Sequence, residues 1–295
     1  MKQIKVDFAP LVKQLEIQAK KNIIISGMTG QYRSVFKGRG MEFEGYRKYD
    51  QSDDARMIDW KASLRSKQPV VRELIEERQL ETLFVFDVSS SMLFASTEKL
   101  KCEYAAELIA TMGFAIIQGG DAAGLLMFSD HKVFQVNMAT GPRQYYLMTR
   151  ALENPKLYEG EYDLDRMLDH LIHFTRRNTT IVMVSDFIGV KGDWRGKLKI
   201  AARKFDLIGI MIRDPRDITM PEVGQVVISD PYTSKEMVID TKRLKDHYAD
   251  AAKKQIEEVQ AAFKEAGADL LFLVSDQGFI KPMREFFMWR RAKWR

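Results

Sequence analysis

Residues 82–91 read TLFVFDVSSS, from Thr82 to Ser91. The first five residues are apolar or β-branched on both faces, which is typical of a strand buried inside a parallel sheet that is covered on both sides. The run then changes abruptly to one aspartate and three serines. The stretch therefore predicts a buried strand with oxygen-bearing side chains at its carboxyl end.

Similar apolar runs alternate with amphipathic helical stretches along residues 79–280. The expected strands are residues 122–128, 132–136, 180–184, 207–212 and 270–274. Between them, helical stripes recur, such as the one from Tyr248 to Phe263 that stops at Gly267. Alternation of this kind predicts an α/β fold with a mostly parallel sheet between two layers of helices. Residues 223–240 interrupt the alternation with two short strand-like runs, a predicted β-ribbon insertion.

The first 78 residues have a different pattern, in which glycines punctuate a segment with dense charge of both signs. We interpret residues 1–78 as a small, partly β module beside the larger domain. Acids and bases intermingle in its second half: Arg47, Asp53, Asp54, Arg56, Asp59 and Arg65. We expect ion pairs that fasten the module to the larger domain. The alternative is a recognition surface with Tyr49 and Trp60 as anchors.

Composition excludes several classes of protein. The 295 residues are 45% hydrophobic and 29% charged, which is ordinary for a globular protein. No apolar run approaches the ~20 residues of a membrane-spanning helix, and the N-terminus lacks the pattern of a secretory signal. The single cysteine, Cys102, excludes an internal disulfide. We therefore expect a cytoplasmic protein.

The net charge of +5 is concentrated in residues 281–295, which hold six bases and one acid. A nucleic-acid binder usually spreads basic charge over a docking face, so we do not expect nucleic-acid binding. We expect a terminal helix that docks Phe286, Phe287 and Trp289 on the protein while its bases face water. The alternatives are contact with an anionic membrane surface or stacking on nucleic acid.

The candidate site combines the end of the first strand with the end of a second. Asp87, Ser89 and Ser91 follow one strand, and Asp186 follows the strand at residues 180–184. In open α/β sheets ligands bind at the carboxyl ends of strands. Two carboxylates and two hydroxyls suit Mg²⁺, or else Mn²⁺ or Ca²⁺. The alternative is that the serines only form a turn and cap the next helix.

The Asp-x-Ser-x-Ser pattern resembles the metal-ion-dependent adhesion site of von Willebrand factor type A domains. The resemblance implies a Rossmann-like, doubly wound fold whose cation is bound by Asp87, Ser89, Ser91, a threonine on a second loop and an aspartate on a third. Asp186 matches the third-loop aspartate. On the second loop Tyr162 stands where the threonine is usual. Asp163 beside it caps its helix, the interpretation we favour, or reaches the ion through a water.

A second resemblance covers the amino-terminal part and extends over nearly the whole chain. The ordered segments at residues 38–43, 47–49, 53–60 and 61–65 are similar to the signature of the bacterial family called domain of unknown function 58. In that family these elements lead directly into a type A domain. The resemblance implies a role as adaptor or co-factor of a MoxR-type AAA+ ATPase. Residue spacing alone does not indicate this partner.

An enzymatic function is the main alternative. Asp87 at a strand end could act as a phosphoryl-accepting nucleophile in a metal-dependent phosphatase. Such enzymes carry a second aspartate two residues later as general acid, and here that position is Ser89. We find neither a nucleophile elbow nor a Gly-rich phosphate loop. We therefore expect a binding protein and not an enzyme, with a partner carboxylate completing the cation site.

Overall fold

The structure is a computed structural model, and it describes residues 41–50, 53–76, 80–130, 133–229 and 236–293. The chain divides into a smaller compact unit, Gly30–Gln79, and a larger unit that includes Leu80–Arg295. Each unit has its own secondary structure.

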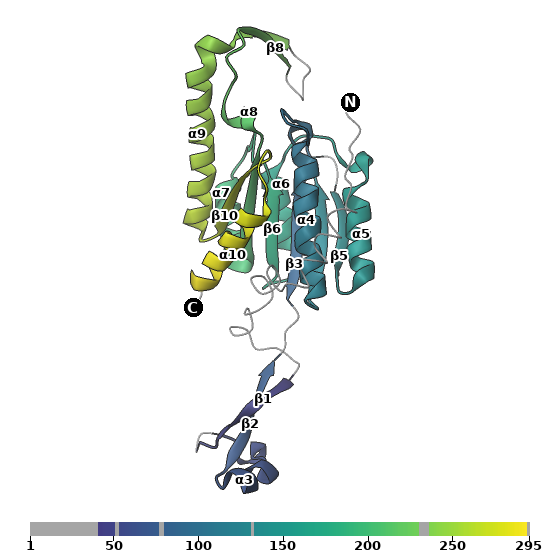
Figure 1. Ribbon diagram of the computed structural model, residues 1–295, viewed down its shortest axis with the longest axis vertical. Helices are drawn as coiled ribbons and strands as arrows, with labels where there is room; N and C mark the ends of the chain where they lie inside the picture. Colours follow the sequence, from purple (N-terminus) through teal and green to yellow (C-terminus); the bar gives the residue numbers. More distant parts are fainter. Residues whose placement is uncertain (1–40, 51–52, 77–79, 131–132, 230–235, 294–295) are drawn as a thin grey trace. The chain divides into compact units, whose positions relative to one another are not determined.

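The larger unit is built on a six-stranded sheet (Figure 1). Its strands are β3 (Glu81–Asp87), β4 (Ala122–Phe128), β5 (Val133–Ala139), β6 (Thr180–Ser185), β7 (Asp206–Arg213) and β10 (Asp269–Val274). Their spatial order is β10-β7-β6-β3-β4-β5, and every pair is parallel except β4 with β5. The predicted doubly wound, mostly parallel α/β sheet is confirmed.

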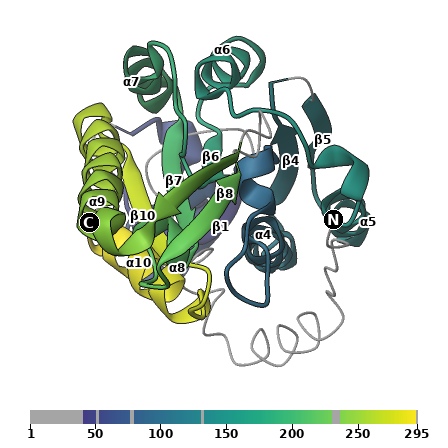
Figure 2. The ribbon, with the colours of Figure 1, turned by 90° about the horizontal axis from the view of Figure 1, so that it is seen from above.

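Helices cover both faces of this sheet (Figure 2). One layer holds α4 (Lys101–Gln118), α5 (Pro142–Leu152) and α10 (Ile280–Lys293), and the other holds α6 (Leu164–Phe174), α7 (Trp194–Lys204) and α9 (Thr241–Ala266). Short helices lie in the connections: η2 (Ser90–Leu93), η3 (Pro155–Leu157) and α8 (Pro215–Ile218). As predicted, the long α9 ends at Gly267, which has a φ of 76°.

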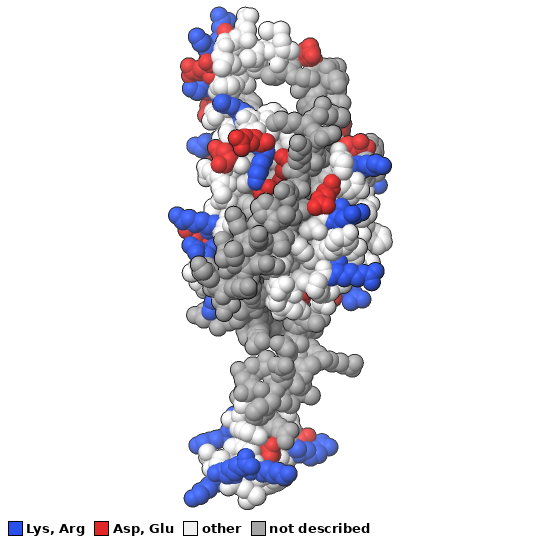
Figure 3. All heavy atoms as spheres, turned by 45° about the vertical axis from the view of Figure 1, so that its right-hand side comes forward, with Lys and Arg blue, Asp and Glu red and all other residues white. Residues whose placement is uncertain are grey.

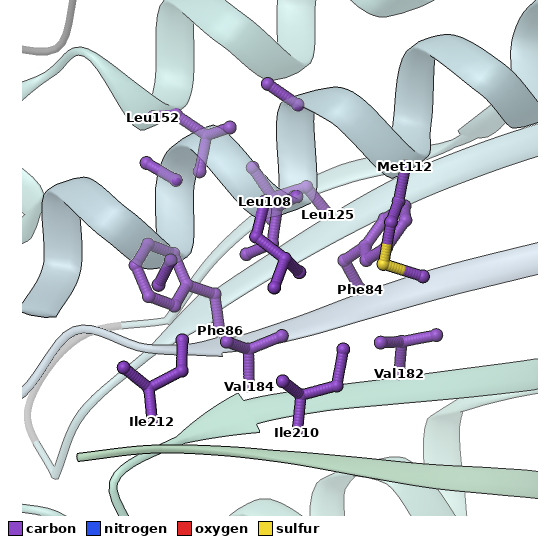
Figure 4. Packing of buried hydrophobic residues seen from close by; sticks show 14 of the residues in the cluster. Phe84, Phe86, Leu108, Met112, Leu125, Leu152, Val182, Val184, Ile210 and Ile212 are labelled. Carbon is purple, nitrogen blue, oxygen red and sulfur yellow. The ribbon is translucent and has the colours of Figure 1, made fainter. Parts of the chain in front are cut away.

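Side chains of each strand alternate between two apolar cores. Phe84 and Phe86 point toward α4, where Leu108 and Met112 pack against them (Figure 4). Their neighbours Leu83 and Val85 belong to the core on the opposite face. Because successive residues of a strand face opposite ways, a strand covered on both sides must be apolar throughout. This is the physical reason for the continuous apolar run in the sequence.

The predicted ribbon insertion is also present. Strands β8 (Gln225–Ser229) and β9 (Glu236–Asp240) pair antiparallel as a separate two-stranded sheet. In Figure 1 this ribbon lies beyond the end of the sheet where the parallel strands finish. Thr241 anchors its base, because its backbone N–H and its hydroxyl both donate to the carbonyl of Gly224, at 2.9 and 2.8 Å.

The smaller unit is partly β, as expected. Strands β1 (Met41–Lys48) and β2 (Val70–Glu76) pair antiparallel, and η1 (Ala55–Met57) and α3 (Trp60–Ser66) lie between them in the sequence. Two ion pairs lie within this unit: Arg47 binds Asp53 at 2.5 Å, and Arg56 binds Asp54 at 3.0 Å. That the charged residues of this unit fasten it to the larger domain stays a prediction. Residues 1–40 of the predicted module lie outside the described residues.

The basic carboxyl-terminal segment forms α10, and its docking differs from the expectation. Phe287 is buried and Phe286 packs against the core, but Trp289 is 52% exposed. Arg290 does not face water: it is 1% exposed and binds Asp206 at 2.6 Å and Asp269 at 2.8 Å. The helix is therefore held by a buried charge network as well as by apolar contacts. Membrane contact through its exposed face stays a prediction.

The described surface of the larger unit carries both signs of charge. Figure 3 shows acidic and basic side chains interspersed on the face that it presents. Among the described residues, no helix combines the length and apolar character needed to cross a membrane.

Candidate functional site at the carboxyl edge of the sheet

The ends of three adjacent parallel strands form the candidate site. Register pairs Phe86 of β3 with Val184 of β6, and Ser185 of β6 with Met211 of β7. The residues that follow these positions therefore emerge at one edge of the sheet. Asp87 and Asp186 lie at this edge and are 1% and 0% exposed.

Asp87, Ser89 and Ser91 form one connected cluster. The backbone N–H of Ser89 donates to Asp87 Oδ1 at 2.9 Å, and the hydroxyls of Ser89 and Ser91 lie 3.1 Å apart. Ser89 precedes η2, yet its side chain makes no capping hydrogen bond. Ser89 thus does not serve as a helix cap, and its hydroxyl is directed toward Ser91 instead.

Ser185 joins this cluster to the neighbouring strand. Its hydroxyl donates to Asp87 Oδ2 at 2.7 Å and accepts the backbone N–H of Phe187 at 2.8 Å. Ser185 was not among the site residues predicted from the sequence. Its place directly before Asp186, at the end of a buried strand, was a signal that could have identified it.

The Asp87 carboxyl has an unusual protonation equilibrium. Its pKa is raised to about 7, because burial and then the negative charge of Asp186 outweigh the hydrogen bonds from Ser185 and Ser89, which lower it. Burial disfavours the charged form because the carboxylate loses its hydration. Two neighbouring carboxylates also repel each other. The Asp87 side of the edge therefore lacks compensating positive charge.

Asp186 has its own partner, a lysine that the sequence analysis did not select. Lys101 Nζ lies 2.7 Å from Asp186 Oδ2 and 2.7 Å from Asp217 Oδ2. The other oxygen of Asp186 accepts the backbone N–H of Ile188 at 2.9 Å. Burial lowers the pKa of Lys101, but attraction to Asp186 and Asp217 outweighs this and leaves the pKa above its ordinary value. The lysine is therefore a buried ammonium ion.

The second loop brings Tyr162 and Asp163 near the edge. Tyr162 is 6% exposed, and its hydroxyl has no hydrogen-bond partner among the described residues. Burial and then the charge of Asp87 hold its pKa well above the ordinary value, so the hydroxyl is protonated. Asp163 caps α6, since its Oδ1 accepts the backbone N–H of Arg166 at 2.9 Å. A water-mediated role of Asp163 toward an ion stays a prediction.

Gly160 fixes this second loop against the first. Its carbonyl accepts the backbone N–H of Ser90 at 2.8 Å. Next to it, Glu161 donates its backbone N–H to Asp130 Oδ1 at 2.7 Å. The φ of Gly160 is 102°, a conformation that side chains rarely adopt, and a Cβ there would meet Ser129 Oγ at 2.7 Å. Only glycine lets the second loop approach Ser129 and Asp130, at the end of β4, so closely.

Comparison with known proteins assigns the family. A family model described as "Protein of unknown function DUF58" matches residues 45–258. The chain belongs to the DUF58 family. The DUF58 resemblance inferred from the sequence is thus confirmed.

DUF58 relatives occur among mycobacterial proteins. The chain is 30% identical over 287 residues to "Uncharacterized protein Rv1480" of Mycobacterium tuberculosis, covering 96% of this chain and 90% of the relative. It is 33% identical over 131 residues to "Uncharacterized protein MAV169" of Mycobacterium avium, covering 44% of this chain and 76% of the relative. The first match spans the smaller and the larger unit.

Solved structures similar to this DUF58 protein include two from Bacteroides. BatB from Bacteroides thetaiotaomicron is 14% identical, with a TM-score of 0.45, covering 72% of this chain and 98% of that protein. An aerotolerance-related membrane protein from Bacteroides fragilis is 16% identical, with a TM-score of 0.44, covering 65% and 90%. A von Willebrand factor type A protein from Catenulispora acidiphila is 14% identical, with a TM-score of 0.34, covering 63% and 44%.

At the carboxyl edge of the sheet, the side chains offer oxygen atoms, which are the ligands that a hard divalent cation prefers. No three carboxylate, imidazole or thiol side chains among the described residues are grouped so that they could hold a metal ion. An ion would therefore depend on the paired hydroxyls of Ser89 and Ser91 in addition to Asp87. The buried hydroxyl of Tyr162, close to Asp87 and Ser185, is a further polar atom at this edge. Asp186, in contrast, is already neutralised by Lys101.

Proposed function

We propose that this DUF58 protein is a protein-interaction module that binds a divalent cation at the carboxyl edge of its sheet. The observation that carries the proposal is the convergence of Asp87 with the hydroxyls of Ser89 and Ser91, which lie 3.1 Å apart. Carboxylate and hydroxyl oxygens are ligands that Mg²⁺, Mn²⁺ and Ca²⁺ prefer, and they do not select zinc.

In this proposal the protein supplies only part of the coordination shell. Ser89 and Ser91 hold the ion directly, and Asp87 and Asp186 provide negative charge beside it. When bound, the cation offers an open position to a carboxylate from a protein partner. The raised pKa of Asp87, to about 7, is consistent with a carboxyl that lacks a positive neighbour in the absence of an ion.

We propose a MoxR-type AAA+ ATPase as the partner, and the cytoplasm as the compartment in which they meet. The support for this partner class is family membership, since no contact in the chain identifies it. The chain would act as an adaptor that the ATPase recognises through the cation site.

Binding is favoured over catalysis by the environment of Ser89. A phosphatase that uses Asp87 as nucleophile needs a proton donor two residues later. Ser89 stands there, and its hydroxyl is engaged with Ser91 Oγ. A serine hydroxyl is too weak an acid for this task. The edge can thus hold an ion but lacks the acid that turnover requires.

The test is direct binding to a purified MoxR-type ATPase encoded by the same genome. The ATPase is immobilised, and the full chain is added in millimolar Mg²⁺ or in EDTA. We expect EDTA, and separately a double variant Ser89→Ala with Ser91→Ala, to weaken binding by about tenfold or more, which is at least ~1.4 kcal/mol.

Ser90→Ala is the matched control, because Ser90 lies between the two ligands and its side chain is outside their hydrogen-bonded cluster. It should bind like the wild type. Binding that ignores both EDTA and the double variant would remove the cation from the proposal. Absence of any binding to the ATPase would remove that partner class.

A further inference from the structure

Lys101 is a deeply buried basic residue beside the candidate site. It is the first residue of α4, and its side chain is 1% exposed. Its Nζ lies 2.7 Å from one oxygen each of Asp186 and Asp217, and 5.8 Å from the centre of the Phe94 ring. A full positive charge is therefore built into the edge, in contact with a carboxylate that the cation would use.

The position of this lysine is unfavourable by local rules. The amino-terminal end of a helix carries partial positive charge, so cations are disfavoured in its first turn. Burial of an ammonium adds a desolvation cost that only close carboxylates offset. Two carboxylates are present, and this explains how the lysine is tolerated there. It also means that removal of either carboxylate or of the ammonium changes the local charge balance.

Asp217 is fixed independently of Lys101. Its Oδ2 also accepts the backbone N–H of Asp214 at 2.9 Å, as part of the cap of α8. Asp214 in turn accepts the backbone N–H of Ser96 at 2.8 Å, from the loop that leads into α4. The second acceptor of the lysine is thus held in place by the fold and stays there if the ammonium releases Asp186.

We propose that Lys101 is an internal competitor of the divalent cation. In the ion-free protein its ammonium neutralises Asp186. An ion binds when the ammonium leaves Asp186 and keeps Asp217 as its carboxylate partner. This inference rests on the proposed function, since it assumes that the cation binds beside Asp87, Ser89 and Ser91. The lysine would then set how tightly the site holds the ion.

Opposite effects of two substitutions follow from this mechanism. Lys101→Met removes the competing charge and leaves Asp186 free, so the cation should bind more tightly. Asp217→Asn removes the alternative acceptor, so the ammonium stays on Asp186 and the cation should bind more weakly. If neither charge acted on the ion, both variants would leave its affinity unchanged. Coulomb attraction at these separations in a partly buried site is strong enough for a clear difference.

The experiment is Mn²⁺ binding to the full chain, measured by electron paramagnetic resonance of the free ion at constant ionic strength. We expect Lys101→Met to lower the dissociation constant by about tenfold and Asp217→Asn to raise it by about the same factor. Lys99→Met is the control, because Lys99 lies two residues before Lys101, pairs with Glu107 instead and has a side chain that is 52% exposed. It should leave the dissociation constant within about twofold.

Folding of each variant is checked by circular dichroism, because Lys101→Met leaves two buried carboxylates without their cation. If that variant does not fold, Lys101→Gln, which keeps a hydrogen-bond donor, and Asp217→Asn decide the question. Unchanged or weaker Mn²⁺ binding in the lysine variants would overturn the inference. The proposed function would survive that result if the double variant Ser89→Ala with Ser91→Ala abolishes Mn²⁺ binding. No Mn²⁺ binding to any variant would overturn both.

Discussion

The hydroxyl of Ser185 donates to Oδ2 of Asp87 at 2.7 Å and so joins the ends of two neighbouring parallel strands. The two residues are 98 positions apart in the sequence. Both are buried, at 2% and 1% exposure. This bond fixes the orientation of the carboxyl that lies at the centre of the candidate site.

Ser185→Ala should destabilise the protein. The substitution leaves a buried carboxyl oxygen without its donor, and such a loss costs about 1–3 kcal/mol. Urea unfolding of the two proteins at neutral pH, followed by circular dichroism, measures the difference. Ser90→Ala is the control. Equal stability of Ser185→Ala and the wild type would show that the bond contributes nothing.

Stability should fall as the pH rises from about 4 to about 7, with Asp87 as a main cause. The folded pKa of Asp87 is about 7, above the ordinary value of 3.8, so in this window the folded protein keeps a proton that the unfolded chain has lost. The contribution of this group is thus complete below the unfolded pKa and is lost as the pH passes the folded pKa. A shift of this size corresponds to roughly 4 kcal/mol.

Asp87→Asn isolates that contribution, because asparagine resembles the protonated carboxyl and does not titrate. We expect the stability of the wild type relative to the variant to decrease across the window and to level off above it. The measurement is urea unfolding in EDTA at a series of pH values. A constant difference between the two proteins would contradict the raised pKa.

Gly160→Ala should destabilise the protein more than a glycine-to-alanine substitution at another position with a positive φ. Besides its φ of 102°, the site has no room for a Cβ beside Ser129 and Asp130. We expect a loss of about 3 kcal/mol or more, because backbone strain adds to a steric clash. Gly189→Ala is the control, since Gly189 has a φ of 73° and open space around it, and it should lose only about 1 kcal/mol. Thermal unfolding compares them; similar losses would show that the close approach of the loops is unimportant.

Arg290→Met should destabilise the larger unit by about 3–5 kcal/mol, because it leaves Asp206 and Asp269 without their buried guanidinium partner. Arg284→Met on the exposed side of the same helix should cost little. Chemical denaturation of both variants checks this difference. If the two variants were equally stable, α10 would be held by its apolar contacts alone.

Several features of the fold could be predicted because they follow from local pattern. The apolar run of β3 had to be covered on both sides, and its change to Asp87 placed a polar group at the strand end. Asp186 follows a strand of the same kind. In a parallel sheet such ends share one edge, so sequence was sufficient to bring Asp87 and Asp186 to the same region. Helices α5 and α7 were not anticipated, since their apolar stripes are short and interrupted by charge.

Other features depended on packing between distant segments. Local rules predict that a lysine at the start of a helix is exposed to solvent. They predict the same for the basic residues of a terminal helix. Lys101 and Arg290 are instead buried, because carboxylates from other strands and loops surround them. Lys101 lies 85 positions from Asp186 and 116 from Asp217. The sequence by itself determined the alternation of buried strands and helices and the edge at which polar groups gather. Only the tertiary structure decided which charges meet there, because electrostatic pairing acts through space and not along the chain.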